Sequence, residues 1–522
     1  MNKHIAICCA DEMIVGRWYK IITFPAYDEG LDSILDYKVT YTCDSNDCAL
    51  MLHDTVYIKK AGGSFTVYAT DMNGYTCNKT INTIEEPDID RDEYTIVPSS
   101  YEDLKSKVMS ISSGYINIPK GEYVFEFTTD PIVLNYGTII DFNGSTVFVT
   151  TKLKNVAYSG FAFIDDYCGI RNINFMGIDV GKGSSYQSSM ESNITYEKCS
   201  TIVVRNGDYC KIENVTYKDL PGFNLTAGLW LRSSKSRWRS ANNYNGYIDD
   251  NGQLVECENA WTMTDMVPID KTDDYGYTVG VIGWYYGPVI SRCRLYDIAF
   301  YDSNKKLLHI SRDHQFYRKY YYPENAEYVR YGIWTLTEPE ELSGYDYDCI
   351  MAMWGKSAYT NKCGNVKELI IDNIRYYNHA SGSFSGTGWL EDIHINRVVA
   401  LGDGWTNNWC LDFEDGWEAM VGGVVSHSAI TGQCVAHSIQ GITYISSILG
   451  TFTLATRCYF ASLINSITGF SWLRSTRGCV TAINSHIGSL SVSDDSGGMH
   501  NFGDIDAETA KYIREKCEKL LS

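Results

Sequence analysis

The chain has 522 residues, enough for two to four domains and a large core. Its 64 acidic residues outnumber 44 Lys and Arg, and the net charge of −20 argues against a nucleic-acid partner, because such binding depends on basic contacts to phosphate. Aromatic residues make up 13% of the chain, with 40 tyrosines and only 10 prolines, a balance that favours an all-β protein.

The N-terminus has a short apolar run followed by two acids, which is too short for the core of a signal peptide. No stretch approaches the roughly 20 apolar residues that a membrane span needs. The 17 cysteines include no compact CxxC repeat, so a zinc ribbon is not expected, and the thiols fit a protein assembled in a cytoplasm. We therefore expect no secretion signal and no membrane insertion.

After an N-terminal arm at residues 1–13, residues 14–86 alternate short strand-like runs with polar turns. Their order resembles the small bacterial immunoglobulin-like domains that serve as spacers on surface and phage proteins. The resemblance implies a small β-sandwich that contacts other virion proteins. The acidic stretch at 87–98 is predicted to be a linker.

A short helix is predicted after Ser100, because a Ser cap is followed by acids in the first turn. Two strand-like segments at 114–125 and 137–145 follow it, the first with a Pro-x-Gly corner. This order resembles the opening of the pectate-lyase-like β-helices of phage tailspikes and polysaccharide-degrading enzymes, in which a helix caps the first coil. The resemblance implies a right-handed parallel β-helix whose first part spans residues 99–232.

The strand periodicity then stops within residues 233–340. The segments 246–252, 300–306 and 323–330, in this order, resemble a jelly-roll-like module of phage and gut-bacterial surface proteins, and the resemblance implies carbohydrate binding. We expect an inserted β-sandwich here, because the cost of closing a loop grows slowly with its length. The coil pattern resumes and is predicted to continue through the second part of the β-helix, residues 341–500.

Five cysteines mark a nearly regular interval in this second part: Cys363, Cys410, Cys434, Cys458 and Cys479. An interval of about 24 residues with one short apolar run per face is typical of a solenoid. The residue after four of these cysteines is apolar, which favours a register in which the cysteines stack. Small thiols of this kind fill tight corners.

Residues 504–522 are predicted to form a helix with acids early and bases late. Ala510, Ile513, Cys517 and Leu520 follow a 3-4-3 spacing. Two interpretations remain open: the helix covers the edge of the last coil, or it forms the seam of a trimeric coiled coil.

An acidic segment at residues 409–418 breaks the apolar pattern. Asp412 and Glu414 point to one side of its strand, and counting back by one cysteine interval places Asp415 over Glu391. Two carboxylates at such a spacing can supply the acid and the base or nucleophile of a glycoside hydrolase. The candidate catalytic residues are therefore Asp412, Glu414, Asp415 and Glu391, and the candidate substrate-binding residues are Trp405, Trp409, Trp417, Asp392 and Asp403.

The alternatives for this segment are a solvated acidic turn or a calcium site that stiffens a bend. No catalytic metal is expected, and a structural calcium ion is the one cofactor left open. A lyase would need a basic residue, for which the late coils offer Arg457, Arg474 and Arg477, and each fits an ordinary surface residue better.

Together with these observations, the resemblances imply a phage tailspike, fibre or appendage located in the virion, assembled in the host cytoplasm and binding a host surface polysaccharide that it also hydrolyses. A homotrimer is expected, because parallel β-helices side by side present several sugar sites at once. Two alternatives stay open: an appendage that binds or serves structurally without cutting, and a bacterial polysaccharide-degrading enzyme.

Overall fold

The computed structural model describes residues 5–25, 38–44, 47–126, 131–150, 161–178, 201–220, 223–227, 243–263, 266–268, 279–282, 293–313, 319–320, 325–335, 352–353, 365–377, 382–386, 389–400, 409–413, 420–437, 441–455, 460–474, 480–492, 499–502, 507–508, 511 and 515. These residues are mostly β-strand, so the protein is all-β with large parallel sheets. Nowhere in these ranges is there a helix with the length and apolar sequence to cross a bilayer.

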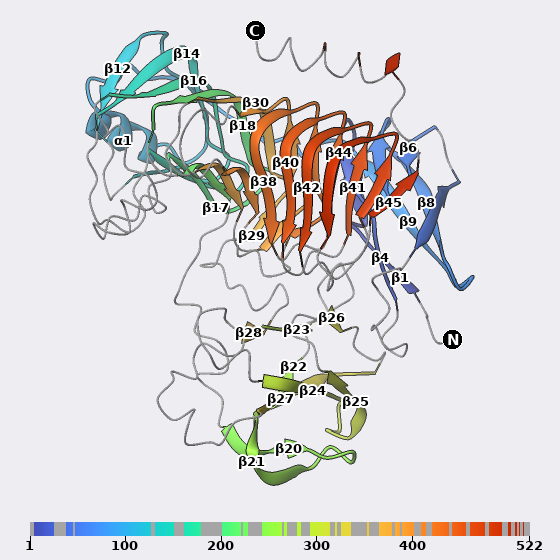
Figure 1. Cartoon of the computed structure of the whole chain (residues 1–522). Helices are drawn as coiled ribbons and strands as arrows, with labels where there is room; N and C mark the ends of the chain where they lie inside the picture. Colours follow the sequence, from blue (N-terminus) through green and yellow to red (C-terminus); the bar gives the residue numbers. More distant parts are fainter. Residues whose placement is uncertain are drawn as a thin grey trace. The chain divides into compact units, whose positions relative to one another are not determined.

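Two compact units divide the chain. The first comprises Met1–Pro25, Glu29–Trp230 and Asn361–Ser522, and the second comprises Ala26–Asp28 and Leu231–Thr360. The larger unit contains both the N-terminal strands and the strands of the predicted coils (Figure 1).

The N-terminal strands form two facing sheets, with orders β2-β9-β8-β5 and β3-β7-β6, beside a separate β1–β4 pair. Alternation along β8 sends Phe65 and Val67 into the core between the sheets and Tyr68 outward. The strands are β1 (Ile5–Cys8), β2 (Glu12–Ile14), β3 (Trp18–Lys20), β4 (Ile22–Pro25), β5 (Val39–Cys43), β6 (Ala49–Leu52), β7 (Thr55–Ile58), β8 (Gly63–Asp71) and β9 (Thr76–Ile84).

Among the described residues, a sheet of 27 strands, called the parallel stack below, forms most of the rest of this unit. Its first strands are β10 (Glu93–Thr95), β11 (Tyr115–Asn117), β12 (Glu122–Phe125), β13 (Ile132–Val133), β14 (Ile139–Val149), β15 (Ala162–Asp165), β16 (Gly169–Gly177), β17 (Ile202–Asp208), β18 (Lys211–Lys218) and β19 (Phe223–Ala227).

The later strands of the parallel stack begin at residue 365. They are β29 (Asn365–Lys367), β30 (Ile370–Tyr377), β31 (Gly382–Gly386), β32 (Trp389–Glu391), β33 (His394–Asn396), β34 (Val399–Ala400), β35 (Trp409–Phe413), β36 (Met420–Val421), β37 (Gly423–Ser426), β38 (Ala429–His437), β39 (Gly441–Ile445), β40 (Ile448–Ala455), β41 (Phe460–Ile464), β42 (Ile467–Arg474), β43 (Val480–Ile483), β44 (His486–Val492) and β45 (Met499–Phe502).

Successive layers of the stack are joined by parallel strand pairs, and the layers differ in the number of residues they contain. The layer from Ile370 to its partner His394 is shorter than the next, from His394 to its partner Val424. Later layers, such as the one from Ile448 to Ile467, are shorter than both. The predicted stacking of cysteines is therefore wrong where the structure describes it: Cys434 lies between Leu411 and Phe452.

Two columns of side chains join the layers in place of the cysteines. Asn172, Asn214 and Asn373 adopt positive φ at successive corners, and each side-chain amide donates to the previous side chain of its column, as Asn373 does to Asn214 at 2.7 Å. In the later layers Ser428, Ser447, Ser466 and Ser485 form a buried column, in which each later hydroxyl accepts a hydrogen bond from the preceding serine's amide at 3.1–3.3 Å.

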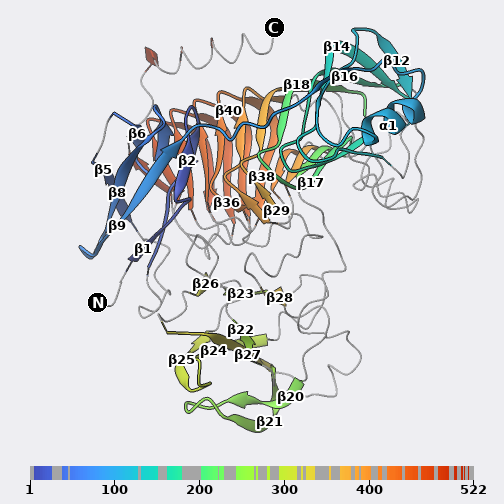
Figure 2. The same cartoon turned by 180° about the vertical axis from the view of Figure 1, so that it is seen from behind.

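One continuous core runs through the stack from Ile96 to Ala482. The predicted helix is present as α1 (Tyr101–Met109), with Ser100 as its N-cap. Its buried residues Tyr101, Leu104 and Val108 belong to the continuous core. Figures 1 and 2 show α1 beside the first strands of the stack.

The second unit consists of antiparallel strands that pair, within the described residues, with one another and with no strand of the stack. The stack is continuous although the second unit interrupts it in the sequence. The strand β18, before the interruption, pairs directly with β30 after it, with Lys211 opposite Ile370. The strands are β20 (Asn243–Ile248), β21 (Leu254–Met263), β22 (Val267–Pro268), β23 (Val279–Ile282), β24 (Cys293–Tyr301), β25 (Leu307–Asp313), β26 (Lys319–Tyr320), β27 (Tyr328–Thr335) and β28 (Ala352–Met353).

Candidate functional site

The N-terminal strands are packed against the later layers of the stack. Trp18 and Leu52 pack against Val424, Ile445 and Ile464, which come from β37, β39 and β41. In Figure 2 the N-terminal strands lie over these layers. The outer face of three successive layers is therefore covered by the chain's own N-terminus, and this contact is called the junction below.

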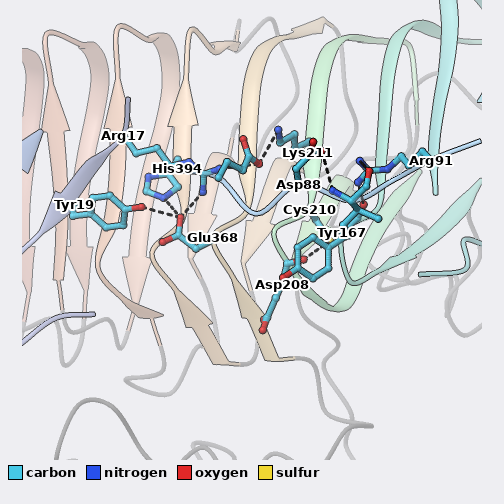
Figure 3. A network of polar contacts seen from close by, with 12 residues as sticks. Arg17, Tyr19, Asp88, Arg91, Tyr167, Asp208, Cys210, Lys211, Glu368 and His394 are labelled. Carbon is cyan, nitrogen blue, oxygen red and sulfur yellow. Dashed lines mark hydrogen bonds and ion pairs between the residues drawn. The ribbon is translucent and has the colours of Figure 1, made fainter. Parts of the chain in front are cut away.

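A buried carboxylate lies at the centre of the polar contacts at the junction. Glu368 occupies the turn between β29 and β30 with a φ of 56° and is 2% exposed. Its Oε2 accepts a hydrogen bond from Arg17 Nη1 at 2.5 Å and one from the Tyr19 hydroxyl at 3.2 Å. His394 Nε2 lies 2.8 Å from the same oxygen, and Figure 3 shows all three side chains converging on it.

These contacts set the charge states of Glu368 and Tyr19. Burial raises the pKa of Glu368, but the charges and hydrogen bonds of His394 and Arg17 outweigh burial and lower this pKa below its ordinary value. The pKa of Tyr19 is raised well above its ordinary value, by burial first and by the Glu368 charge second. Tyr19 therefore stays a neutral donor beside an ionised carboxylate.

A second buried ion pair holds the junction further along the stack. Lys20 Nζ lies 2.6 Å from Asp54 Oδ2 and donates to Ser462 Oγ of β41 at 2.7 Å. Burial lowers the pKa of Lys20, whereas the pKa of Asp54 is lowered because Lys20 and His53 outweigh the opposing effect of burial. The hydroxyls of Thr55 and Thr443 add a bond of 2.8 Å across the junction.

The predicted linker also lies against the stack. Residues 85–92, called the strap, carry Glu86, which pairs with Arg17 at 3.0 Å and with Lys211 at 2.7 Å. Further along, Arg91 donates to the carbonyls of Gly137 and Tyr167, and Figure 3 shows Arg91 and Tyr167. The next strand, β10, then pairs with β11. Glu86 therefore links Arg17 of the N-terminal region to Lys211 of β18, and Arg91 attaches the strap to the first layers, so both residues are suited to holding two parts of the chain together.

Two of the predicted site residues lie next to this network. Glu391 ends β32 and is 2% exposed, and Asp392 follows it in a corner with a φ of 49° at 1% exposure. Asp392 is close enough to Tyr19 for its charge to raise the pKa of that hydroxyl. Both carboxylates are buried among the residues that build the junction.

The register assumed for the acidic pair does not hold. Glu391 pairs with Lys367 in the preceding layer and Val421 in the next, because the layer that follows Glu391 is longer than the cysteine interval. Asp412 belongs to a different ladder, between Ser385 and Val435. Trp409 begins the same strand, β35; the other predicted site residues, Asp403, Trp405, Glu414, Asp415 and Trp417, lie outside the described residues.

An outward-facing pair of aromatic residues lies on the later layers, and it was not predicted from the sequence. Phe470 and Trp472 of β42 are 37% and 39% exposed. Their ladder neighbours are hydroxyl residues on both sides: Phe470 lies between Thr451 and Ser489, and Trp472 between Thr453 and Ser491. The alternation of aromatic and small residues in β42 is the signal that could have identified this face, called the aromatic face below.

No group of three or more His, Cys, Asp or Glu side chains is arranged to hold a metal ion in the described part of the chain. The predicted acidic segment lies largely outside that part, so the calcium hypothesis stays a prediction.

No family model matches the chain, and no curated protein matches it.

Proposed function

We propose that this protein is a bacteriophage tail appendage that binds a polysaccharide on the host cell surface. The observation that carries the proposal is the aromatic face, where two exposed aromatic residues have hydroxyl-bearing residues as their ladder partners in the neighbouring layers. Aromatic rings stack on the apolar faces of sugars, and neighbouring hydroxyls can bond the sugar hydroxyls.

We infer that the stack is a right-handed parallel β-helix. Regular parallel pairing between layers, a continuous inner core and the asparagine and serine columns support this inference. Right-handed crossovers are the rule for parallel strands that return to the same sheet. Such a scaffold keeps outward side chains about 4.8 Å apart from layer to layer, which suits an extended polymer.

The N-terminal sandwich has one sheet turned toward the stack and a second sheet, β2-β9-β8-β5, on its other side. We assign contact with other virion proteins to the second sheet, whose outward residues include Tyr68. The antiparallel second unit is assigned as an additional sugar-binding sandwich.

Binding of the full-length protein to a panel of purified bacterial capsular and lipopolysaccharide O-chain polysaccharides tests the proposal. We expect saturable binding to at least one polysaccharide and none to a neutral control such as dextran. New reducing ends in the same incubation would add hydrolysis and bring the segment 409–418 back as its site. If the panel is drawn from the phage's own host and the protein binds none of its polysaccharides, that result would contradict the proposal.

A further inference from the structure

The two ends of the stack differ in how their core is covered. At the beginning, Leu104 and Val108 of α1 are fully buried against the first layers. At the other end, the last strand of the ladder β38-β40-β42-β44 leaves two inward-facing residues exposed: Leu490 at 44% and Val492 at 42%.

These two residues continue core columns and are not outward-facing. Leu490 follows Phe452 and Ser471, which are both fully buried. Val492 follows Leu473, which is also fully buried. Leu473 is covered by the layer of β44, whereas no described residue covers β44 in the same way. An end of this kind needs a cap, because a solenoid otherwise exposes its core.

The chain supplies a segment that fits. β45 ends at Phe502 in the last layer, and residues 504–521 follow directly. The apolar positions of that segment, Ala510, Ile513 and Cys517, have the same 3-4 spacing as the buried Tyr101, Leu104 and Val108 of α1. Both segments also carry acids at their beginning, as α1 does at Glu102 and Asp103.

The described residues of the C-terminal segment are consistent with a helix that has one polar side and one apolar side. Glu508, Lys511 and Glu515 are exposed, and Lys511 pairs with Glu515 one turn on. On a helix these residues lie on the side opposite Ile513 and Cys517. A polar side in water and an apolar side free to dock are what a cap requires.

We propose that residues 504–521 dock across the last layer as a helix and cover Leu490 and Val492, as α1 covers the first layers. This cap closes the core within one chain and blocks end-to-end pairing between copies. It does not depend on the proposed function.

Hydrogen exchange of the full-length protein tests the cap, with the amides of β44 as the readout and those of β14 at the far end as the internal reference. Ile513→Asp places a carboxylate on the apolar side, and Ala507→Asp places the same group on the exposed side of the same segment. We expect exchange in β44 to become at least roughly tenfold faster in Ile513→Asp and to stay unchanged in Ala507→Asp, with β14 unchanged in both.

A second variant approaches the contact from the other side. Val492→Asp should expose the C-terminal segment to trypsin at Lys511 and Lys516, while Ser489→Asp on the outward side of the same strand should not. If each variant shows the same hydrogen exchange or the same trypsin cleavage as its control, the proposed cap is wrong. Loss of oligomeric mass in Ile513→Asp, measured by sedimentation, would also overturn it, because the apolar side would then join separate copies.

Discussion

At the scale of single residues, the junction depends on charges that are buried and paired. Arg17 and Glu368 are far apart in the sequence, and they are 7% and 2% exposed. Removing one member of such a pair is costly, because the other charge remains buried without its counter-ion. Sequence inspection does not show this, since neither residue lies in a recognisable motif.

Glu368→Gln should therefore lower the free energy of unfolding by about 3 kcal/mol. Asp372→Asn is the matched control: Asp372 pairs with Arg397, which is 47% exposed, and a solvent-exposed pair of this kind contributes about 1 kcal/mol or less. Urea unfolding of both variants checks the difference. Equal losses would mean that burial at the junction adds nothing.

The same residue predicts a dependence on pH. The pKa values of Glu368 and Asp54 are lower in the folded protein than the ordinary values of about 4.3 and 3.9 for free side chains. The stability that these carboxylates provide is thus fully present above those ordinary values, and it is lost as the pH falls through the lower folded values.

Urea midpoints measured from about pH 6 to pH 3 should fall, and they should fall less steeply in Glu368→Gln than in the unaltered protein. Identical slopes in the two proteins would show that Glu368 does not titrate with a lowered pKa.

At the scale of elements, the helix and the strands were predicted best where the pattern depends on residues close together in the sequence. The Ser100 cap correctly placed α1, and the short β-branched runs became parallel strands. The register between neighbouring layers could not be predicted from the sequence, because the number of residues per layer changes along the stack. A fixed step therefore aligned Glu391 with Asp415, whereas its ladder partner is Val421.

The serine column shows what holds the shorter, later layers together. Ser466→Ala removes the acceptor for the Ser447 amide and a donor to the Ile464 carbonyl, both in the core. We expect a loss of about 1–3 kcal/mol in the free energy of unfolding, because a buried amide loses its partner. Ser489→Ala, at an exposed position, should change it by less than about 0.5 kcal/mol. A similar small effect at Ser466 would remove the column's role.

At the scale of the whole molecule, the contact between the N-terminal sandwich and the stack could not be predicted. It joins residues from distant parts of the sequence, such as Lys20 and Ser462, and depends on the final shape of both faces. Residues 87–98 looked like a linker because the stretch is acidic and polar, yet Arg91 donates hydrogen bonds to the carbonyls of Gly137 and Tyr167 in the stack.

The second unit should be dispensable for the fold of the first. Because β18 pairs directly with β30, the layers on both sides of the insertion are already neighbours. Replacing residues 231–360 by a short Gly/Ser linker should preserve the β-sheet circular dichroism and the urea midpoint of the first unit. A shortened protein that is unfolded or aggregated would show that the second unit contributes to the stack.

The most direct test of the proposed function compares two aromatic residues of similar exposure. Trp472 lies on the aromatic face, and Tyr68, 43% exposed, lies on the N-terminal sandwich. Binding to the polysaccharide selected from the panel should weaken at least roughly tenfold in Trp472→Ala and stay unchanged in Tyr68→Ala. Undiminished binding by Trp472→Ala, with its urea midpoint intact, would contradict the assignment of this face to host polysaccharide.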